Sequence, residues 1–115
     1  MTMKQILRGR LPGVMQTKLE QRYDELLGQR LAAGEILWYR YEGIRLRLGK
    51  NSNYTPDFAL MRADGQLELH EVKGSWQAKN QRDGKTKLRV AAGMYPFTFF
   101  GVTYDRRLGW QFQEF

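Results

Sequence analysis

The sequence predicts a single α/β (α+β) domain over residues 1–115, in which two helices flank a mixed central sheet. Two segments have apolar side chains at helical spacing, and six have the short alternating or apolar pattern of strands. At 115 residues the chain is long enough to build one hydrophobic core without metal or disulfide support. The predicted order of elements is α-β-β-β-β-α-β-β.

The first part of the chain is expected to form a loose arm followed by a helix. Residues 1–16 contain two Gly and one Pro and show no periodic pattern. Over 17–33, Leu and Tyr recur every three or four residues, which predicts a helix. Thr17 and Glu20 have the spacing of a capping box, and Gly34 is suited to end the helix.

The remaining segments predict six strands and a second helix. Strands are expected at 36–41, 44–48, 58–62, 67–73, 97–104 and 110–115, with a polar loop over 49–53. The second helix is expected over about 85–95, because its apolar residues share one face and Pro96 follows.

The turn between the third and fourth strands decides which side chains share a face. A two-residue loop would place Asp57 and Glu71 on opposite faces of the hairpin. A three-residue loop over 63–65 would place them opposite each other, with Gly65 in the left-handed conformation. We predict the three-residue loop. The shared face is then apolar in its middle and carries Asp57, Glu71 and Lys73 at one end.

These three charged residues form the most informative cluster in the chain. Glu71 and Lys73 are two apart in a strand and therefore project from the same face. With Asp57 beside them, two carboxylates converge and offer the oxygen ligands that Mg²⁺ prefers. The alternative interpretation is a structural cluster of ion pairs.

The motif resembles that of the PD-(D/E)XK nuclease superfamily. Pro56-Asp57 is followed after thirteen residues by Glu71-Val72-Lys73. The predicted order also resembles the restriction-endonuclease-like core of that superfamily, with one strand extra. More narrowly, the chain resembles small phage and prophage endonucleases of the Holliday-junction-resolvase-like type over about residues 17–100. The matching segments are 17–23, 54–58, 70–76, 87–92 and 95–96.

This resemblance implies Mg²⁺-dependent hydrolysis of phosphodiester bonds in DNA, with Mn²⁺ as a substitute. Asp57, Glu71 and the backbone carbonyl of Val72 would hold the metal. Lys73 would orient or help deprotonate the attacking water. Glu20 would match the extra acidic metal ligand of resolvase-like members, although its capping-box position is a complete structural explanation. Gly93 stands where relatives often have an acidic residue.

The segment around the second helix is strongly basic. Between residues 73 and 89 there are six basic residues and one acidic residue. We expect this surface to contact nucleic-acid phosphates, the alternative being a solvated helix face. Trp76 would stack on a base or cap the core. The residues assigned to this surface are Trp76 and five basic residues, Lys79, Arg82, Lys85, Lys87 and Arg89.

Other conspicuous residues are given structural interpretations. Alternation along the strand puts His70 on the face opposite Glu71, so it is expected to be structural. Arg45 and Arg47 alternate with apolar residues and are expected to face solvent. The aromatic residues of 110–115 would lie in the core or at a dimer edge.

Composition limits the classes of function. Nineteen Lys and Arg against twelve Asp and Glu give a net charge of +7, which suits a polyanionic partner. With no Cys and one His, a disulfide framework, a thiol nucleophile and a thiolate zinc site are excluded. The longest uncharged stretch, 90–104, is too short to span a bilayer. We expect a cytoplasmic protein, of a bacterium or of a phage-infected host, without membrane association.

The function predicted from these observations is a metal-dependent DNA endonuclease, selective for DNA structure or branching rather than for sequence. Cutting of opposing strands at a junction implies a homodimer. One alternative is a non-catalytic basic DNA-binding module that keeps the fold. Another is a nuclease acting on single-stranded nucleic acid, and the residues do not distinguish DNA from RNA.

Overall fold

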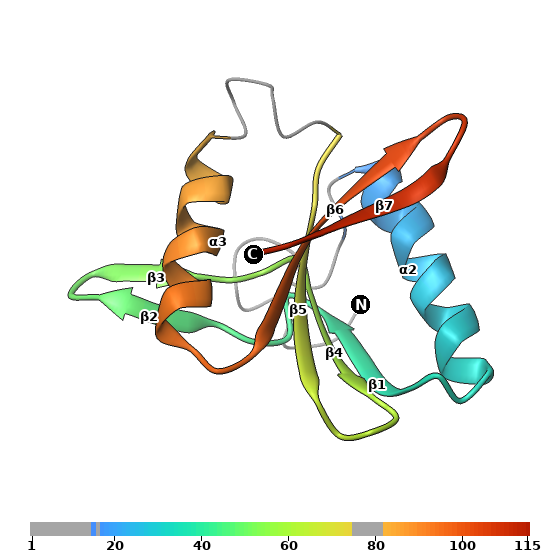
Figure 1. Cartoon of the computed structure of the whole chain (residues 1–115), viewed down its shortest axis with the longest axis horizontal. Coiled ribbons are helices and arrows are strands. Elements are labelled where there is room, and N and C mark those ends of the chain that lie inside the picture. Colours follow the sequence, from blue (N-terminus) through green and yellow to red (C-terminus); the bar gives the residue numbers. More distant parts are fainter. Residues whose placement is uncertain (1–14, 16, 75–81) are drawn as a thin grey trace, which may run out of the picture.

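The computed structural model describes residue 15, residues 17–74 and residues 82–115. Figure 1 shows two helices and a twisted sheet that passes between them. The predicted arm therefore lies, except for Met15, outside the described residues. The described elements are α2 (Lys18–Ala32), β1 (Ile36–Tyr41), β2 (Leu46–Gly49), β3 (Ser52–Tyr54), β4 (Phe58–Arg62), β5 (Leu67–Val72), α3 (Arg82–Met94), β6 (Thr98–Asp105) and β7 (Gly109–Glu114).

The architecture is α+β, with a mixed five-stranded sheet in the order β1-β4-β5-β6-β7 and a separate two-stranded sheet of β2 and β3. Strands β5 and β6 are parallel, whereas the other neighbouring strands of the large sheet are antiparallel. The observed order contains one strand more than predicted, because β3 lies where a polar loop was expected. Ser52 and Asn53 lack an apolar pattern, and β3 forms only by pairing with β2.

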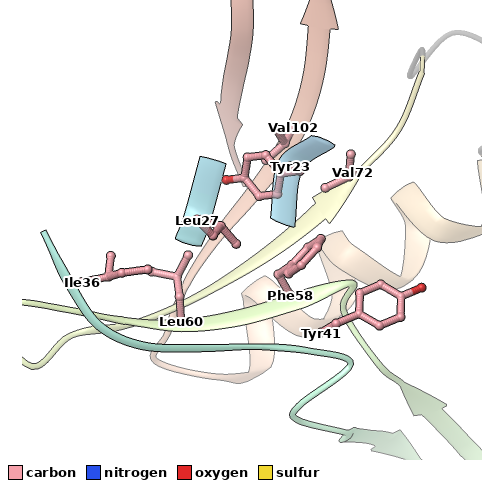
Figure 2. Packing of buried hydrophobic residues seen from close by; sticks show 8 residues of the cluster. All are labelled: Tyr23, Leu27, Ile36, Tyr41, Phe58, Leu60, Val72 and Val102. Atoms are coloured by element: carbon pink, nitrogen blue, oxygen red, sulfur yellow. The ribbon is translucent and has the colours of Figure 1, made fainter. Parts of the chain in front are cut away.

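The two helices cover opposite faces of the five-stranded sheet. Residues alternate along β4 and β5, so neighbours in sequence enter different clusters. Toward α2, Tyr23 and Leu27 pack against Phe58, Leu60 and other buried side chains (Figure 2). Toward α3, the buried side chains are Leu46, Tyr54, Ala59, Leu69, Leu88, Ala91 and Phe99.

The β4–β5 hairpin has the predicted three-residue turn. The amide of Arg62 donates to the carbonyl of Gln66 at 2.9 Å, and Gly65 has a φ of +86°. Phe58 pairs with His70 and Ala59 with Leu69, so the ladder extends to place Asp57 beside Glu71. A shift of the pairing register by one residue would turn the side chains of one strand to the opposite face of the sheet. The turn, which fixes this register, therefore determines which residues meet at the site.

The start of α2 is the predicted capping box. The Glu20 amide donates to Thr17 Oγ1 at 3.0 Å, and the Thr17 amide donates to Glu20 Oε1 at 2.9 Å. Together they satisfy two amides that the first turn of a helix leaves without partners. Neither α2 nor the described part of α3 has the length and apolar character needed to cross a membrane.

The aromatic side chains of β7 differ in burial. Trp110 packs edge-on against Tyr23 with ring centroids 5.0 Å apart, and Phe115 packs against the cluster beneath α3. Phe112 is 47% exposed on the outermost strand of the sheet. The core interpretation therefore holds for Trp110 and Phe115 but not for Phe112.

Candidate active site

Asp57 and Glu71 are held together by reciprocal backbone contacts at the start of β4 and the end of β5. The Val72 amide donates to Asp57 Oδ2 at 2.8 Å. The Asp57 amide donates to Glu71 Oε1 at 3.3 Å. Each carboxylate thus accepts a hydrogen bond from the main chain beside the other, which fixes both side chains by the register of the hairpin. The predicted convergence of these two residues is confirmed.

Tyr54 and Lys73 complete the surroundings of Glu71. The buried Tyr54 hydroxyl donates to Glu71 Oε1 at 2.9 Å. The Lys73 ammonium lies 3.3 Å from Glu71 Oε2, and its side chain is 25% exposed against 7% for that of Glu71. One oxygen of Glu71 is therefore tied into the protein, whereas the other faces a lysine that reaches solvent.

The acidity of both carboxyls is perturbed. Burial, together with the negative charge of Glu71, raises the pKa of Asp57 to about 8, although the Val72 amide and Lys73 oppose this rise. Burial also raises the pKa of Glu71, against the lowering effect of Lys73 and of the Tyr54 hydrogen bond. At neutral pH the pair therefore holds a proton, which a cation could replace.

Glu20 approaches the pair from α2. Its Oε1 accepts from the Thr17 amide and hydroxyl, and its Oε2 accepts from the Tyr41 hydroxyl at 2.8 Å. Its charge contributes to the raised pKa of Asp57. Glu20 thus lies near the site while its carboxylate serves the helix cap and the end of β1.

The donor set near β5 consists of two carboxylates and the main chain. Within the described part of the chain, no group of three or more His, Cys, Asp or Glu side chains is arranged to hold a metal ion. Glu20 therefore does not join Asp57 and Glu71 in such a group, and its role as a metal ligand stays a prediction. Two carboxylate oxygens and a backbone carbonyl such as that of Val72 are nevertheless ligands suited to Mg²⁺, which retains several waters in proteins.

His70 lies on the other face of β5, as predicted. It is 1% exposed, its Nδ1 lies 2.6 Å from the Tyr23 hydroxyl, and its Nε2 lies 2.9 Å from Glu68 Oε1. Burial lowers the pKa of His70, although Glu68 opposes the shift. Arg62 in turn lies 3.6 Å from the second oxygen of Glu68. This cluster is part of the core beneath α2 and does not face the carboxylate pair.

The predicted nucleic-acid contacts are described in part. Lys87 projects from α3 to the face that carries the carboxylate pair, and its Nζ lies 3.4 Å from the Asn53 carbonyl, next to Tyr54. Lys85 is half-buried, and Arg89 is exposed with its guanidinium 5.9 Å from the Phe115 ring. Trp76, Lys79 and the side chain of Arg82 lie outside the described residues.

The sequence did not predict the contacts of three buried or partly buried tyrosine hydroxyls with ionisable side chains. Tyr54 donates to Glu71, Tyr41 donates to Glu20, and Tyr23 contacts His70. Burial raises the pKa of all three hydroxyls, so they stay neutral, and those of Tyr41 and Tyr54 act as donors. The position of Tyr54 three residues before Asp57 could have indicated its contact with the site. The polar residues before it predicted a loop, however, and not the strand β3 that orients its side chain.

Comparison with family models, with curated proteins and with solved structures gives no match. The interpretation of the site therefore depends on its own geometry. The site consists of the paired carboxyls of Asp57 and Glu71, whose pKa values are raised, with Lys73 beside Glu71. The basic helix α3 lies on the same face of the sheet.

Proposed function

We propose that this chain is a Mg²⁺-dependent DNA endonuclease with a restriction-endonuclease-like fold. The observation that carries the proposal is the convergence of Asp57, Glu71 and Lys73 at one end of the β4–β5 hairpin. Counted over the five-stranded sheet alone, the succession is α2-β1-β4-β5-α3-β6, followed by β7. This succession and the helices on opposite faces of the mixed sheet support the fold assignment. A purely structural cluster of ion pairs would not need two adjacent carboxylates with one lysine beside Glu71.

Asp57, Glu71 and the Val72 carbonyl are the groups that would hold Mg²⁺. When bound, the ion would polarise a phosphate oxygen and lower the pKa of a coordinated water. Tyr54 and the Asp57 amide orient Glu71 from behind, and the Val72 amide orients Asp57. The protein thus restricts both carboxylates before any ligand arrives, as preorganised sites require.

Lys73 is the group suited to the reacting phosphate. Its ammonium is anchored by Glu71 Oε2 at 3.3 Å, yet its side chain is partly exposed. From this position it can offset the negative charge that develops on the phosphoryl group and orient the attacking water. Lys85, Lys87 and Arg89 on α3 would contribute phosphate contacts along the same side of the sheet.

The substrate we propose is DNA recognised by its structure or branching, because the basic side chains on α3 are suited to backbone phosphates, and contacts with phosphates do not depend on base sequence. Cleavage of opposing strands at a four-way junction would need a second copy of the chain. The exposed Phe112 on edge strand β7 is a surface at which such a copy could pack.

A cleavage assay tests this proposal directly. Linear, single-stranded, nicked and four-way-junction DNA are incubated with the protein, with Mg²⁺ or with a chelator. We expect Mg²⁺-dependent products that fall by at least about 10³-fold in Asp57→Asn and Lys73→Ala. Glu25→Gln and Lys18→Ala, which change exposed residues of α2, are the matched controls and should retain activity.

Cleavage that persists in Asp57→Asn or Lys73→Ala would contradict the proposed site. Equal cleavage of every substrate would remove only the preference for branched DNA. A non-catalytic DNA-binding module is the second candidate, favoured by the finding that no three-carboxylate group is formed by the described residues. Binding of DNA without cleavage under any divalent metal would select that candidate.

A further inference from the structure

The β2–β3 hairpin is a basic ribbon without acidic residues. We use this name for residues 44–55, which carry Arg45, Arg47 and Lys50 between Gly43 and Pro56, with no Asp or Glu. All three basic side chains are exposed. Within the described part of the chain none of them forms an ion pair, whereas Arg30 and Arg62 pair with nearby carboxylates. Among the residues that the structure describes, the positive charge of the basic ribbon therefore has no carboxylate partner.

The basic ribbon is fixed against α3. Leu46 and Tyr54 pair across the ribbon and are buried with Leu88 of α3. The Tyr95 hydroxyl, just after α3, donates to the Arg47 carbonyl at 2.6 Å. Lys87 donates to the Asn53 carbonyl on the other strand. Both strands are thus held by the helix, so Arg45 and Arg47 project from a supported surface and not from an isolated loop.

The same ribbon is joined to the carboxylate pair. Tyr54 at the end of β3 donates to Glu71, and Asp57 follows three residues later. Lys50, at the turn of the ribbon, precedes Asp57 by seven residues. An extended chain of that length spans at most about 23 Å. Figure 1 shows β2 and β3 running from the central sheet to a tip beyond α3.

We propose that the basic ribbon is a second attachment site for duplex DNA, reached by phosphates about seven nucleotides or fewer from those at the carboxylate pair. The spacing follows from the 3.4 Å rise per nucleotide of each strand. Duplex DNA is the favoured ligand because its stiffness keeps phosphates at a fixed separation, whereas a single strand does not. This inference depends on the proposed function for its reference point at Asp57 and Glu71.

The test compares two matched double variants in binding. Arg45→Gln with Arg47→Gln removes charge from the basic ribbon, and Arg106→Gln with Arg107→Gln removes the same charge from the exposed β6–β7 turn. Binding of a labelled 24-base-pair duplex is measured by fluorescence anisotropy in chelator, so that no cleavage occurs. Thermal melting shows that both variants fold.

The expected result is a loss specific to the ribbon. The ribbon variant should bind the duplex about 10- to 60-fold more weakly at 0.1 M salt. The slope of log K against log salt concentration should be smaller in magnitude by about 2, because each of two lost phosphate contacts contributes about 0.9 to that slope. The turn variant should differ from wild type by less than about threefold.

Equal losses in the two variants, or no binding by wild type, would overturn the inference. An equal ribbon effect on single-stranded DNA of the same length would overturn the assignment to duplex. These outcomes are separate from the proposed function, which is decided by cleavage. If the protein cuts DNA and the two double variants lose affinity equally, only the inference about the ribbon is wrong. If the protein binds DNA through the ribbon but does not cut it, only the nuclease assignment is wrong.

Discussion

Two buried clusters of ionisable side chains lie on opposite faces of β5 and differ in how their charges are matched. On the α2 face, His70 contacts the Tyr23 hydroxyl and the Glu68 carboxylate, so each polar group has a complementary partner. On the α3 face, Asp57 and Glu71 lie beside each other, and burial raises the pKa of both. The first cluster is enclosed, whereas the second opens to solvent through Lys73.

This difference bears on how each cluster affects stability. The His70 cluster lowers the free energy of the fold, because removing any member leaves a buried group without a partner. The Asp57–Glu71 pair raises it, since two acidic groups share a desolvated site. Perturbed acidic pairs are enriched at catalytic and metal sites, which is in keeping with the function proposed above.

The largest expected effect contrasts substitutions in the two clusters. His70→Ala should lower the free energy of unfolding by about 3 kcal/mol, because Tyr23 and Glu68 lose their buried partner. Asp57→Asn should leave stability unchanged or raise it at neutral pH, because the cost of keeping a proton on the buried acidic pair disappears. Urea unfolding followed by circular dichroism measures both. Equal destabilisation by the two substitutions would show that the pair is as structural as the His70 cluster.

A smaller effect should separate the two tyrosine–carboxylate hydrogen bonds. Tyr54→Phe removes the donor that lowers the pKa of Glu71, so the Mg²⁺ concentration for half-maximal cleavage should rise by about 10- to 100-fold. High Mg²⁺ should restore most activity. Tyr41→Phe removes the corresponding donor to Glu20 and is the matched control. If Tyr41→Phe raises the Mg²⁺ requirement equally, Glu20 belongs to the metal site.

A further effect is the pH dependence of stability, which should have opposite signs for the two clusters. Asp57 has a pKa of about 8 in the fold against 3.8 as a model value, so its contribution to stability is lost as pH rises between these values. His70 has a pKa lowered from 6.5, so stability is lost as pH falls below 6.5 and the unfolded chain binds the proton.

Variants isolate these two slopes, each of which is at most about 1.4 kcal/mol per pH unit. Relative to wild type, Asp57→Asn should gain stability progressively from pH 4 to 8. His70→Gln should lose less stability than wild type as pH falls from 6.5 to 5. Unfolding curves at half-unit pH intervals measure both slopes. If the difference in free energy of unfolding between a variant and wild type changes with pH in the opposite direction, the corresponding assignment is refuted.

The parts of the fold that sequence predicted well are those determined by local patterns. The capping box at Thr17 and Glu20, the left-handed Gly65 and the pairing of Asp57 with Glu71 are all confirmed. Each follows from residue types within a few positions of one another or from the parity of a single turn. The helices and most strands also lie within three residues of their predicted bounds.

The missed features depend on contacts between distant residues. Strand β3 contains two polar residues and forms because β2 pairs with it and α3 covers Tyr54. The bonds from Tyr54 to Glu71 and from Tyr41 to Glu20 join residues 17 and 21 positions apart. Spacing along the chain contains no signal for such pairs. The charge of Glu20 contributes to the raised pKa of Asp57, and its hydrogen bond with Tyr41 depends on the packing of α2 against β1.

The three-residue turn at Gly65 has a consequence for how relatives of this chain could differ in length. Asp57 and Glu71 face each other only while the register that pairs Phe58 with His70 is kept. One residue inserted or deleted in a single strand, between the turn and the acids, would invert the faces of that strand and separate the two acids. Matched changes of one residue in each strand would keep the two acids opposite each other. Length variation that retains the site should therefore occur in both strands together or within the turn itself, because loops of several lengths can join the same pair of strands.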